Sequence, residues 1–540
     1  MTGATRRWFG RAALALAGMT GVAGYALAAG QDVNWDSRNY HFYLPWAVLH
    51  GRLEFDFVAA GIQTFLNPLV YFPYHLLVLH LPPRAATVGL AALQALSLVP
   101  VYLLALHFLP PLPSGSRRGL ALLATLTGGT APLFLTEAGT SFADNLVSLP
   151  LLAGVLVACR DLDADRSRAA EKRRPLALLL AGACIGAAAG LKLTSMVYVF
   201  GFLVALVVAV PLAEKGRQLI AAICGMIVGG LLTGGGWAWS LWAAYRSPTF
   251  PFLNDIFRSP LHPARRSDDP RFLPASFLDA LGYPFEWLVG RHPTCEVPFR
   301  DARFALIVGL AVALLVAFTV RRLTGRSRPA NGAAESARAG VRRGEVFLIV
   351  FFFCSGALWL KQFAIQRYIV TLELLSGVLL VVLVARTVGW TRAARWSAGM
   401  LLLAVIAWGR PANYGRIPWG ESWFGVEPTP AMSAPSTLFI SFGHDPVSFV
   451  APFLPKSARH VRLTGDLGVG VPFGQRGTAI VASHAGPIRT LAEGELSPET
   501  RDVLAGLGLS VADEECESLS TRAASLLSCP VRRLPVSAQH

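Results

Sequence analysis

Long apolar runs recur along the first 409 residues of this chain, and they constrain its fold more than any other feature. A helix needs about 20 apolar residues to cross a bilayer, and eleven segments approach that length. Only 15% of all residues are charged, whereas soluble domains average roughly 25%. We therefore predict an α-helical polytopic membrane protein with about eleven transmembrane helices. The segments span residues 11–30, 86–109, 119–136, 143–159, 176–191, 195–213, 219–243, 304–320, 345–360, 368–386 and 396–409.

Basic residues between these runs predict how the chain is oriented. Short cytoplasmic loops collect Lys and Arg, and the predicted inner segments hold 23 such residues, against 14 in the outer segments before residue 410. The N-terminus is therefore predicted to be cytoplasmic and the C-terminal part periplasmic. The high Ala, Arg and Gly content indicates a GC-rich bacterial source, and hence the inner (cytoplasmic) membrane. The formal charge of +15 is spread over short clusters, so no nucleic-acid partner is expected.

Two outer segments are too long to be turns. Segment 31–85 carries an apolar run, Phe65–Leu81, that Pro68 and Pro73 interrupt, so we expect short interfacial helices there instead of another span. Loop 246–303 is rich in Pro and aromatic residues and is predicted to form a lid over the outer face. The N-terminal run fits either a cleaved signal peptide or an uncleaved first transmembrane helix, and both leave segment 31–85 outside.

From residue 410 onward the composition becomes that of a soluble domain. The chain is therefore predicted to divide into a membrane domain, 1–409, and a small outer α/β domain, 410–540. An oxidising compartment would join Cys516 and Cys529 of the outer domain in a disulfide, and two free buried thiols are the alternative. Periodicity predicts strands at Ser436–Phe442 and Thr478–Ser483, and helices at Pro498–Leu507 and Ser518–Leu527.

The first outer segment holds the leading candidate for chemistry, Asp36. It lies in the polar run Asn34–Tyr43, and Asp32, Glu54 and Asp56 crowd the same segment. Nearby carboxylates and partial burial raise the pKa of an acid toward that of a useful general base. The alternative is that Asp36 only caps a helix. If the run is an α-helix, Asp36 shares one face with Asn39, Tyr40 and Tyr43, while Arg38 and His41 lie on another.

Three short outer turns add charges to the same side of the membrane. Asp144, Lys192 and Arg367 each occupy one turn, with Gln366 beside Arg367. Cations there suit a phosphate, which Arg grips with two prongs and Lys as a point charge. Asp36 and Asp144 together could form a two-carboxylate site for a divalent metal or an acceptor. A capping role for Asp144 and snorkelling of the cations to the headgroups are the alternatives.

A surface with an acid, hydroxyls and cations beside a Tyr- and Trp-rich run suits a ligand with a polar head and an apolar tail. A lipid-linked sugar phosphate is such a ligand. The sequence contains no Walker loop, GxSxG elbow, HExxH motif or paired CxxC. ATP-driven transport and zinc chemistry therefore lose most of their support.

Four short pieces of the sequence resemble the GT-C class of integral-membrane glycosyltransferases, which use polyprenyl-phosphate sugars as donors. Relatives in that class commonly have an acidic residue in the first outer loop as the base, and many carry a soluble C-terminal outer domain. This chain departs from the frequent Asp-Glu pair because Ser37 follows Asp36, so the need for a metal stays open. The four pieces are Trp35–Tyr43, the turn that ends in Asp144, Gly190–Lys192 and Gln366–Tyr368.

The resemblance implies a hexosyl- or pentosyltransferase that moves a sugar from a polyprenyl-phosphate donor to a glycan, lipid or protein acceptor, with inversion. Asp36 would be the catalytic base, and Arg367, Lys192 and, third, Arg38 would bind the donor phosphate. A transporter or flippase of a lipid-linked glycan and a non-catalytic cell-envelope scaffold are the alternatives. Membrane lipid is expected around the helices. The substrate is expected to contact Asp144, Tyr40, His41, Gln366 and Asp56.

Overall fold

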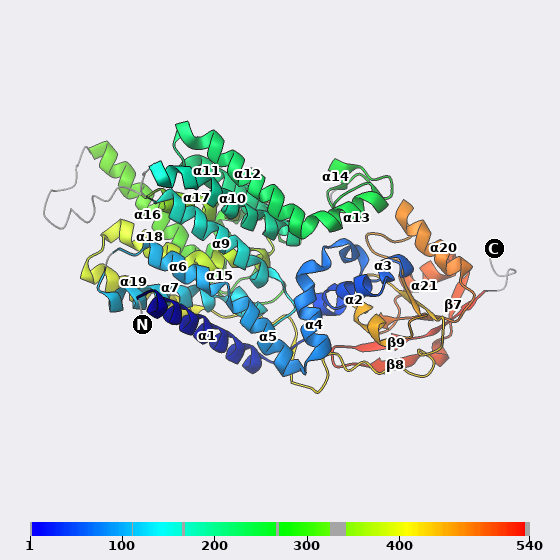
Figure 1. The fold of residues 1–540 in the computed structure, drawn as a ribbon. Coiled ribbons are helices and arrows are strands. Elements are labelled where there is room, and N and C mark those ends of the chain that lie inside the picture. The colour runs from blue at the N-terminus through cyan, green and yellow to red at the C-terminus, as the bar shows by residue number, and fades with distance from the viewer. Residues whose placement is uncertain (1–2, 111, 165–167, 266–268, 325–341, 535–540) are drawn as a thin grey trace.

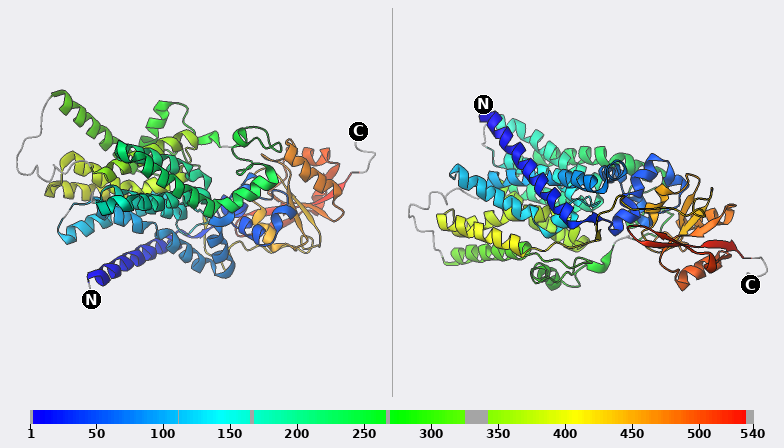
Figure 2. Two further views of the ribbon diagram at one scale, coloured as in Figure 1. Left: turned by 45° about the horizontal axis from the view of Figure 1, so that its top comes forward. Right: turned by 90° about the horizontal axis from the view of Figure 1, so that it is seen from below.

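Helices form one long body, and a smaller β-rich part lies at the end where the C-terminus is found (Figure 1). The computed structural model describes residues 3–110, 112–164, 168–265, 269–324 and 342–534. The first outer segment lies between the two parts in all three views (Figures 1 and 2). This architecture is the predicted one, a helical membrane protein with a small C-terminal α/β region.

Each of the eleven predicted apolar segments coincides with a helix or with consecutive helices. Within the described residues, seven helical runs are long and apolar enough to cross a bilayer, and Ala15–Ala29 and Leu193–Ala209 are shorter apolar stretches. The number of crossings stays a prediction. The helices are α1 (Gly3–Ala29), α5 (Pro83–Ala95), α6 (Leu98–Phe108), α7 (Ser114–Gly129), α8 (Pro132–Glu137), α9 (Asp144–Leu162), α10 (Arg168–Leu191), α11 (Met196–Ala209), α12 (Lys215–Gly230), α13 (Gly236–Tyr245), α16 (Arg303–Thr324), α17 (Arg343–Gln362), α18 (Val370–Val388) and α19 (Arg392–Trp408).

The core of the helical body is the span formed by η9 (Gln366–Ile369) and α18. Of the most apolar stretch of this span, 89% is buried inside the protein. Such burial is expected of a helix that is apolar on every side. On another side of the body, α10 and α12 pack with close backbone contact, because a Cβ on Gly186 would collide with the carbonyl of Met226. Small residues at such crossings are typical of membrane helices. This packing fixes the end of α10, and with it the position of Lys192.

The first outer segment consists of short elements, as its prolines predict. The run from Phe65 to Leu81 forms η3 and the nine-residue α4, which is too short to cross a bilayer. The described residues of loop 246–303 form three further short helices, α14 (Asn254–Phe257), η7 (Pro270–Phe272) and α15 (Phe277–Leu288). The elements of the first segment are β1 (Gln31–Asp32), η1 (Ser37–His41), α2 (Tyr43–Leu49), α3 (Arg52–Phe55), η2 (Gly61–Phe65), η3 (Pro68–Tyr71) and α4 (Phe72–His80).

In its described residues, the C-terminal region forms two sheets of its own, two α-helices and short 3-10 helices. The larger sheet has the strand order β4-β3-β5-β10-β7, with β3 parallel to both of its neighbours, and the smaller one has the order β6-β9-β8. A third, two-stranded sheet pairs β2 (Arg416–Ile417) with β1, so it ties the C-terminal region to the first outer segment. The other elements are β3 (Leu438–Ser441), β4 (Arg459–Arg462), α20 (Gln475–Ser483), β5 (Ile488–Thr490), β6 (Ala492–Glu493), α21 (Pro498–Gly506), β7 (Leu509–Val511), β8 (Glu517–Ser520), β9 (Ser525–Ser528) and β10 (Pro530–Arg533).

The predicted strand at Thr478–Ser483 is wrong, because these residues lie in helix α20. The buried positions of α20 are Gly477 and Val481, which are four residues apart and therefore share one helix face. A short apolar run does not by itself distinguish a strand from a helix. The other strand predicted here, Ser436–Phe442, contains β3 and is confirmed.

The predicted helix at Ser518–Leu527 is also wrong, because this segment forms the β8–β9 hairpin. Leu519 and Leu526 pair directly across the hairpin and are buried in the same core cluster. The Thr521 hydroxyl accepts the backbone N–H groups of the turn that joins the strands. This side-chain turn competes with helix formation. The helix predicted at Pro498–Leu507 is confirmed as α21.

Cys516 and Cys529 form a disulfide bond that closes a loop of 13 residues. Closing a loop of that length stabilises the folded state by roughly 3 kcal/mol, because it restricts the unfolded chain. We expect the double variant Cys516→Ala/Cys529→Ala to lose about that much stability, measured by urea unfolding of the purified protein without reductant. Cys224→Ala, which removes an exposed free thiol, is the matched control. An unchanged midpoint in the double variant would contradict this prediction.

Candidate active site

Two ion pairs lie where α9 begins, α10 ends and α18 begins. Arg367 Nη1 donates to Asp36 Oδ2 at 2.7 Å, and Lys192 Nζ donates to both carboxylate oxygens of Asp144, at 2.7 and 2.6 Å. Both Lys192 and Asp144 also act electrostatically on Asp36. The structure therefore brings together the four charged residues that the sequence placed on one side of the membrane.

Neither carboxylate serves as a helix cap. Asp36 makes no capping hydrogen bond at the start of η1, and Asp144 is already the first residue of α9, after Ala143. The cations do not extend toward headgroups either, because the side chains of Lys192 and Arg367 are only 14% and 19% exposed. The capping and snorkelling alternatives are therefore wrong for these residues.

The polar run after Asp36 forms a π-helix, η1, instead of the expected α-helix. A π-helix aligns residues five apart, so His41 comes to the side of Asp36 and faces the two cations. Tyr40 stays beside Asp36. Asn39 turns away toward the C-terminal region, where Arg462 donates to its Oδ1 at 3.2 Å. The predicted division of the run into two α-helical faces is therefore wrong.

The charged cluster is buried among aromatic rings. Burial raises the pKa of Asp36 above its ordinary value, and the attraction of Arg367 and Lys192 only partly offsets this effect. The Arg367 guanidinium lies 5.1 Å from the ring centroid of Phe142 and 5.4 Å from that of Tyr368, and Lys192 Nζ lies 4.9 Å from the Tyr368 ring. Charges in such a setting act more strongly on a ligand than charges in water.

Two buried N–H donors beside the ion pairs have no hydrogen-bond partner in the described part of the chain. They are Arg367 Nε and Gln366 Nε2. The Gln366 amide is held in place by the predicted lid loop, because the Thr294 hydroxyl donates to its Oε1 at 2.6 Å. A buried donor without a partner is costly, so each of these two N–H groups would gain from an oxygen acceptor.

Glu137, at the end of α8, is a buried acid that the sequence analysis missed. Its Oε2 accepts the N–H of Asn145 at 3.2 Å, while Oε1 has no partner among the residues described. Burial and the nearby carboxylate of Asp144 raise the pKa of Glu137 well above its ordinary value. An acidic residue at the end of an apolar run was the signal that could have found it. Tyr71, Ser141 and Phe142 gave no comparable signal, because such residues are common in interfacial segments.

Two residues predicted to contact the donor or acceptor lie elsewhere. Arg38 forms an ion pair with Glu493 of β6 at 2.8 Å. Asp56 accepts two hydrogen bonds from Arg52 and one from the Tyr43 hydroxyl, so its carboxylate is already satisfied. The Arg38–Glu493 pair joins the first outer segment to the C-terminal region, whereas the Arg52–Asp56 pair lies within the segment. The structure therefore does not bring Arg38 and Asp56 to the two ion pairs.

The C-terminal region holds the helix that carries the site. Ser448 donates to the backbone carbonyl of Asn39, and Arg462 donates to Asn39 Oδ1 and to the carbonyls of Ala59 and Asp445. Trp35 Nε1 donates in turn to the carbonyl of His444 at 3.1 Å. These contacts tie η1 and its flanking residues to the C-terminal region. The C-terminal region therefore has a direct structural connection to the candidate base.

Among the residues that the structure describes, no group of three or more His, Cys, Asp or Glu side chains could hold a metal ion. Asp36 and Asp144 are each bound by a cationic side chain. The sequence analysis considered these two carboxylates as ligands of a divalent metal. In the structure Arg367 and Lys192 occupy the positions beside them.

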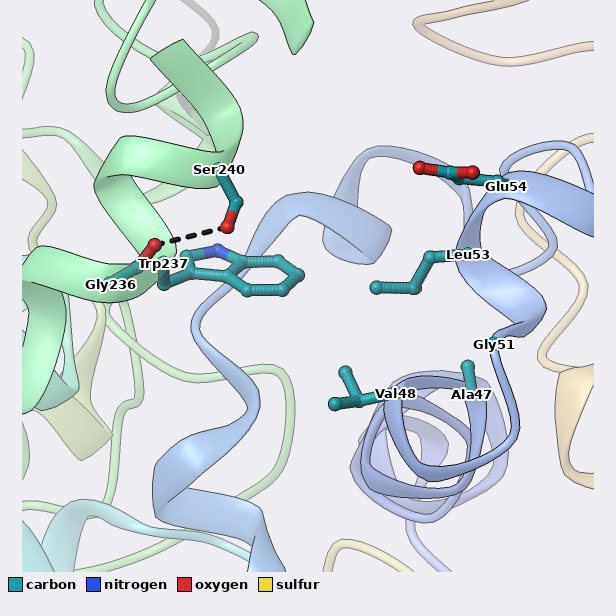
Figure 3. A pocket seen from close by; sticks show the side chains of 8 residues that line it. All are labelled: Ala47, Val48, Gly51, Leu53, Glu54, Gly236, Trp237 and Ser240. Carbon is teal, nitrogen blue, oxygen red and sulfur yellow. Dashed lines mark hydrogen bonds between the residues drawn. The ribbon is translucent and has the colours of Figure 1, made fainter. Parts of the chain in front are cut away.

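A separate open cavity of about 550 Å³ lies between the first outer segment and α13. Figure 3 shows the Trp237 ring pointing across it toward Leu53 and Val48, with Glu54 at one side. One turn before Gly236, the carbonyl of Thr233 accepts a hydrogen bond from Asn67 Nδ2, which also donates to the carbonyl of Gly190. The wall of this apolar cavity is therefore connected to the turn that carries Lys192.

No model of a protein family matches the sequence, and no curated protein sequence matches it significantly. The structure is similar to two crystal structures of ArnT from Cupriavidus metallidurans. The apo structure matches with a TM-score of 0.52 and 14% identity over 98% of both chains. The structure bound to undecaprenyl phosphate matches with a TM-score of 0.49 and 12% identity over 96% of this chain and 98% of that one. The apo match shows that the chain has the fold of ArnT, a GT-C glycosyltransferase, which confirms the predicted fold.

Proposed function

We propose that the chain is a membrane glycosyltransferase that moves a hexose or pentose from a polyprenyl-phosphate donor to a glycan, lipid or protein acceptor. The observation that carries this proposal is the buried Asp36–Arg367 ion pair, with a second cation, Lys192, acting on the same carboxylate. This set supplies both an acid–base group and positive charge for a phosphate. The fold shared with ArnT supports the same class of reaction.

In the proposed reaction, a carboxylate oxygen of Asp36 takes the proton of the acceptor hydroxyl while the hydroxyl oxygen attacks C1 of the donor sugar. The bond between C1 and the phosphate oxygen breaks, and polyprenyl phosphate leaves with the electron pair. Arg367 and Lys192 stabilise the charge that develops on the phosphate. A single displacement inverts the configuration at C1. Phosphate is a good leaving group, so its departure requires cations that stabilise its charge more than an acid that protonates it.

An apolar tail on the donor fits the surroundings of the site. The cavity beside α13 is lined mainly by apolar side chains and is connected to the Lys192 turn. The buried charges Asp301, Arg303 and Glu373 also lie at helix ends, at the start of α16 and of α18. A transport path would instead need charges near the middle of the membrane, so this distribution supports an enzyme over a flippase.

We place the site and the C-terminal region on the periplasmic side of the inner membrane. The basic inner loops support this orientation, and the Cys516–Cys529 disulfide is typical of an oxidising compartment. A lipid-linked donor also suits an enzyme on that side, because it replaces the cytosolic nucleotide sugar. The orientation is checked by labelling single cysteines in the C-terminal region with an impermeant reagent on intact cells.

The proposal is tested with purified full-length protein in nanodiscs. Radiolabelled polyprenyl-phosphate sugars are offered with lipid and glycan acceptors extracted from a bacterial envelope, and the products are separated and their anomeric configuration is determined. Transfer with inversion is the expected result. If no donor supports transfer but lipid-linked glycan crosses proteoliposome membranes that contain the protein, the flippase alternative is correct instead.

Transfer is expected to fall as the pH is lowered through the pKa of Asp36. Burial raises that pKa above its ordinary value, and a general base acts only when it is deprotonated. The rate should therefore be constant above the raised pKa and fall about tenfold for each pH unit below it. The measurement is kcat/KM from about pH 4 to about pH 9. A profile without an acid limb would contradict the assignment of a raised carboxylate pKa to the base.

A further inference from the structure

A chain of hydrogen bonds fixes the imidazole of His41. Asn34 Oδ1 accepts the N–H of Ser37 at 2.9 Å, which sets the orientation of the Asn34 amide. Its Nδ2 donates to Asp32 Oδ1 at 2.7 Å and to Ser141 Oγ at 2.9 Å. Ser141 Oγ lies 2.8 Å from His41 Nδ1. All of these residues are buried.

These contacts favour the tautomer of His41 that carries its proton on Nε2. Ser141 Oγ accepts a hydrogen bond from Asn34 Nδ2, and in the described part of the chain His41 Nδ1 is the acceptor that its own hydrogen can reach. His41 Nδ1 is then the acceptor, and the proton of the neutral ring lies on Nε2. His41 Nε2 makes no hydrogen bond to any residue in the described ranges. The ring therefore offers one N–H donor.

The surroundings keep this ring neutral. His41 stacks on Tyr71 with ring centroids 4.2 Å apart and meets Phe142 edge-on at 6.0 Å. Burial, followed by the positive charges of Lys192 and Arg367, lowers the pKa of His41 well below its ordinary value. The neutral ring differs from the cations beside it because it offers an N–H donor without a net charge, which is what an uncharged hydroxyl or ring oxygen requires.

We propose that His41 Nε2–H binds a hydroxyl or ring oxygen of the donor sugar, and that Ser141, Asn34 and Asp32 position the imidazole for this contact. This inference rests on the proposed function and adds a specificity role to it. The two cations bind the phosphate of the donor. His41, with the rings of Tyr71 and Phe142, distinguishes a sugar-bearing lipid from bare polyprenyl phosphate.

Two substitutions of His41 test the roles of its two ring nitrogens separately. The side-chain amide of His41→Asn lies near the position of Nδ1, so it keeps the Ser141 contact and loses the outer donor. The longer side chain of His41→Gln places an N–H near the position of Nε2. We expect His41→Asn to weaken binding of a polyprenyl-phosphate sugar about fivefold to tenfold, with binding of the sugar-free polyprenyl phosphate unchanged. His41→Gln should keep most of the preference for the sugar-bearing lipid.

The experiment measures Kd of the purified full-length protein in nanodiscs by calorimetry, for one polyprenyl phosphate with and without mannose, glucose or arabinofuranose attached. Ser141→Ala tests the positioning role, with an expected loss of about threefold in sugar preference, and Ser141→Thr, which keeps the hydroxyl, should restore it. An unchanged ratio of the two Kd values in His41→Asn would overturn this inference alone. If the wild-type protein binds neither lipid, the proposed function fails, and the inference fails with it. Thermal unfolding of every variant shows that the compared proteins are folded.

Discussion

Asp36→Asn is expected to lower kcat for sugar transfer by about 10²–10⁴-fold, which is the usual contribution of a general base. The amide keeps the size and shape of the carboxylate but cannot take a proton from the acceptor hydroxyl. Arg367, which donates to Asp36 at 2.7 Å, loses its anionic partner and remains available to a phosphate. Donor affinity should therefore be unchanged or higher, and the loss should appear in kcat.

The measurement is initial transfer rate against donor concentration, with Kd for polyprenyl phosphate measured in parallel. Asp36→Glu keeps a base in a displaced position and should recover part of the rate. The matched control is Asp56→Asn, because Asp56 lies in the same outer segment but pairs with Arg52. We expect that control to lower the unfolding temperature while its kcat, measured well below that temperature, stays near the wild-type value. Normal transfer by Asp36→Asn would show that the base is another residue.

The sequence could predict that the charges of the site lie at the same end of the helical body, because the order of the spans assigns alternate loops to the same end; which side of the membrane this is stays a prediction. The apolar runs predict the spans, and the predicted spans group four charged residues in turns at one end: Asp36, Asp144, Lys192 and Arg367. Sequence could not predict which acid meets which cation. Arg38 is only two residues from Asp36, yet its partner is Glu493, because the π-helix turns it toward the C-terminal region.

The errors in the C-terminal region have a related cause. In short elements the local pattern is weak, and tertiary contacts decide the structure. The segment around Val481 is apolar enough for a strand, but it covers the sheet as a helix. Glu137 was missed because its local sequence resembles an ordinary helix end. Only the fold places it beside Asp144.

Lys192→Met is the second substitution with a large expected effect, because it acts on both stability and donor binding. Lys192 and Asp144 form a buried pair with side chains 14% and 6% exposed. Removing one partner of such a pair typically costs about 3–5 kcal/mol, since the other charge remains buried without compensation. We expect the variant to unfold at a clearly lower temperature and to bind polyprenyl phosphate about 10- to 100-fold more weakly.

The double variant Lys192→Met/Asp144→Asn separates these two effects. The amide that replaces the carboxylate of Asp144 is uncharged, so most of the lost stability should return, because no unpaired charge remains. If Lys192 binds the donor phosphate, affinity for polyprenyl phosphate stays low in the double variant, because its cation is still missing. If affinity returns together with stability, the pair serves only to hold α9 against the end of α10, and Arg367 is then the cation that binds the phosphate. Unfolding temperature and Kd, measured on the wild type, the two single variants and the double variant, distinguish the two results.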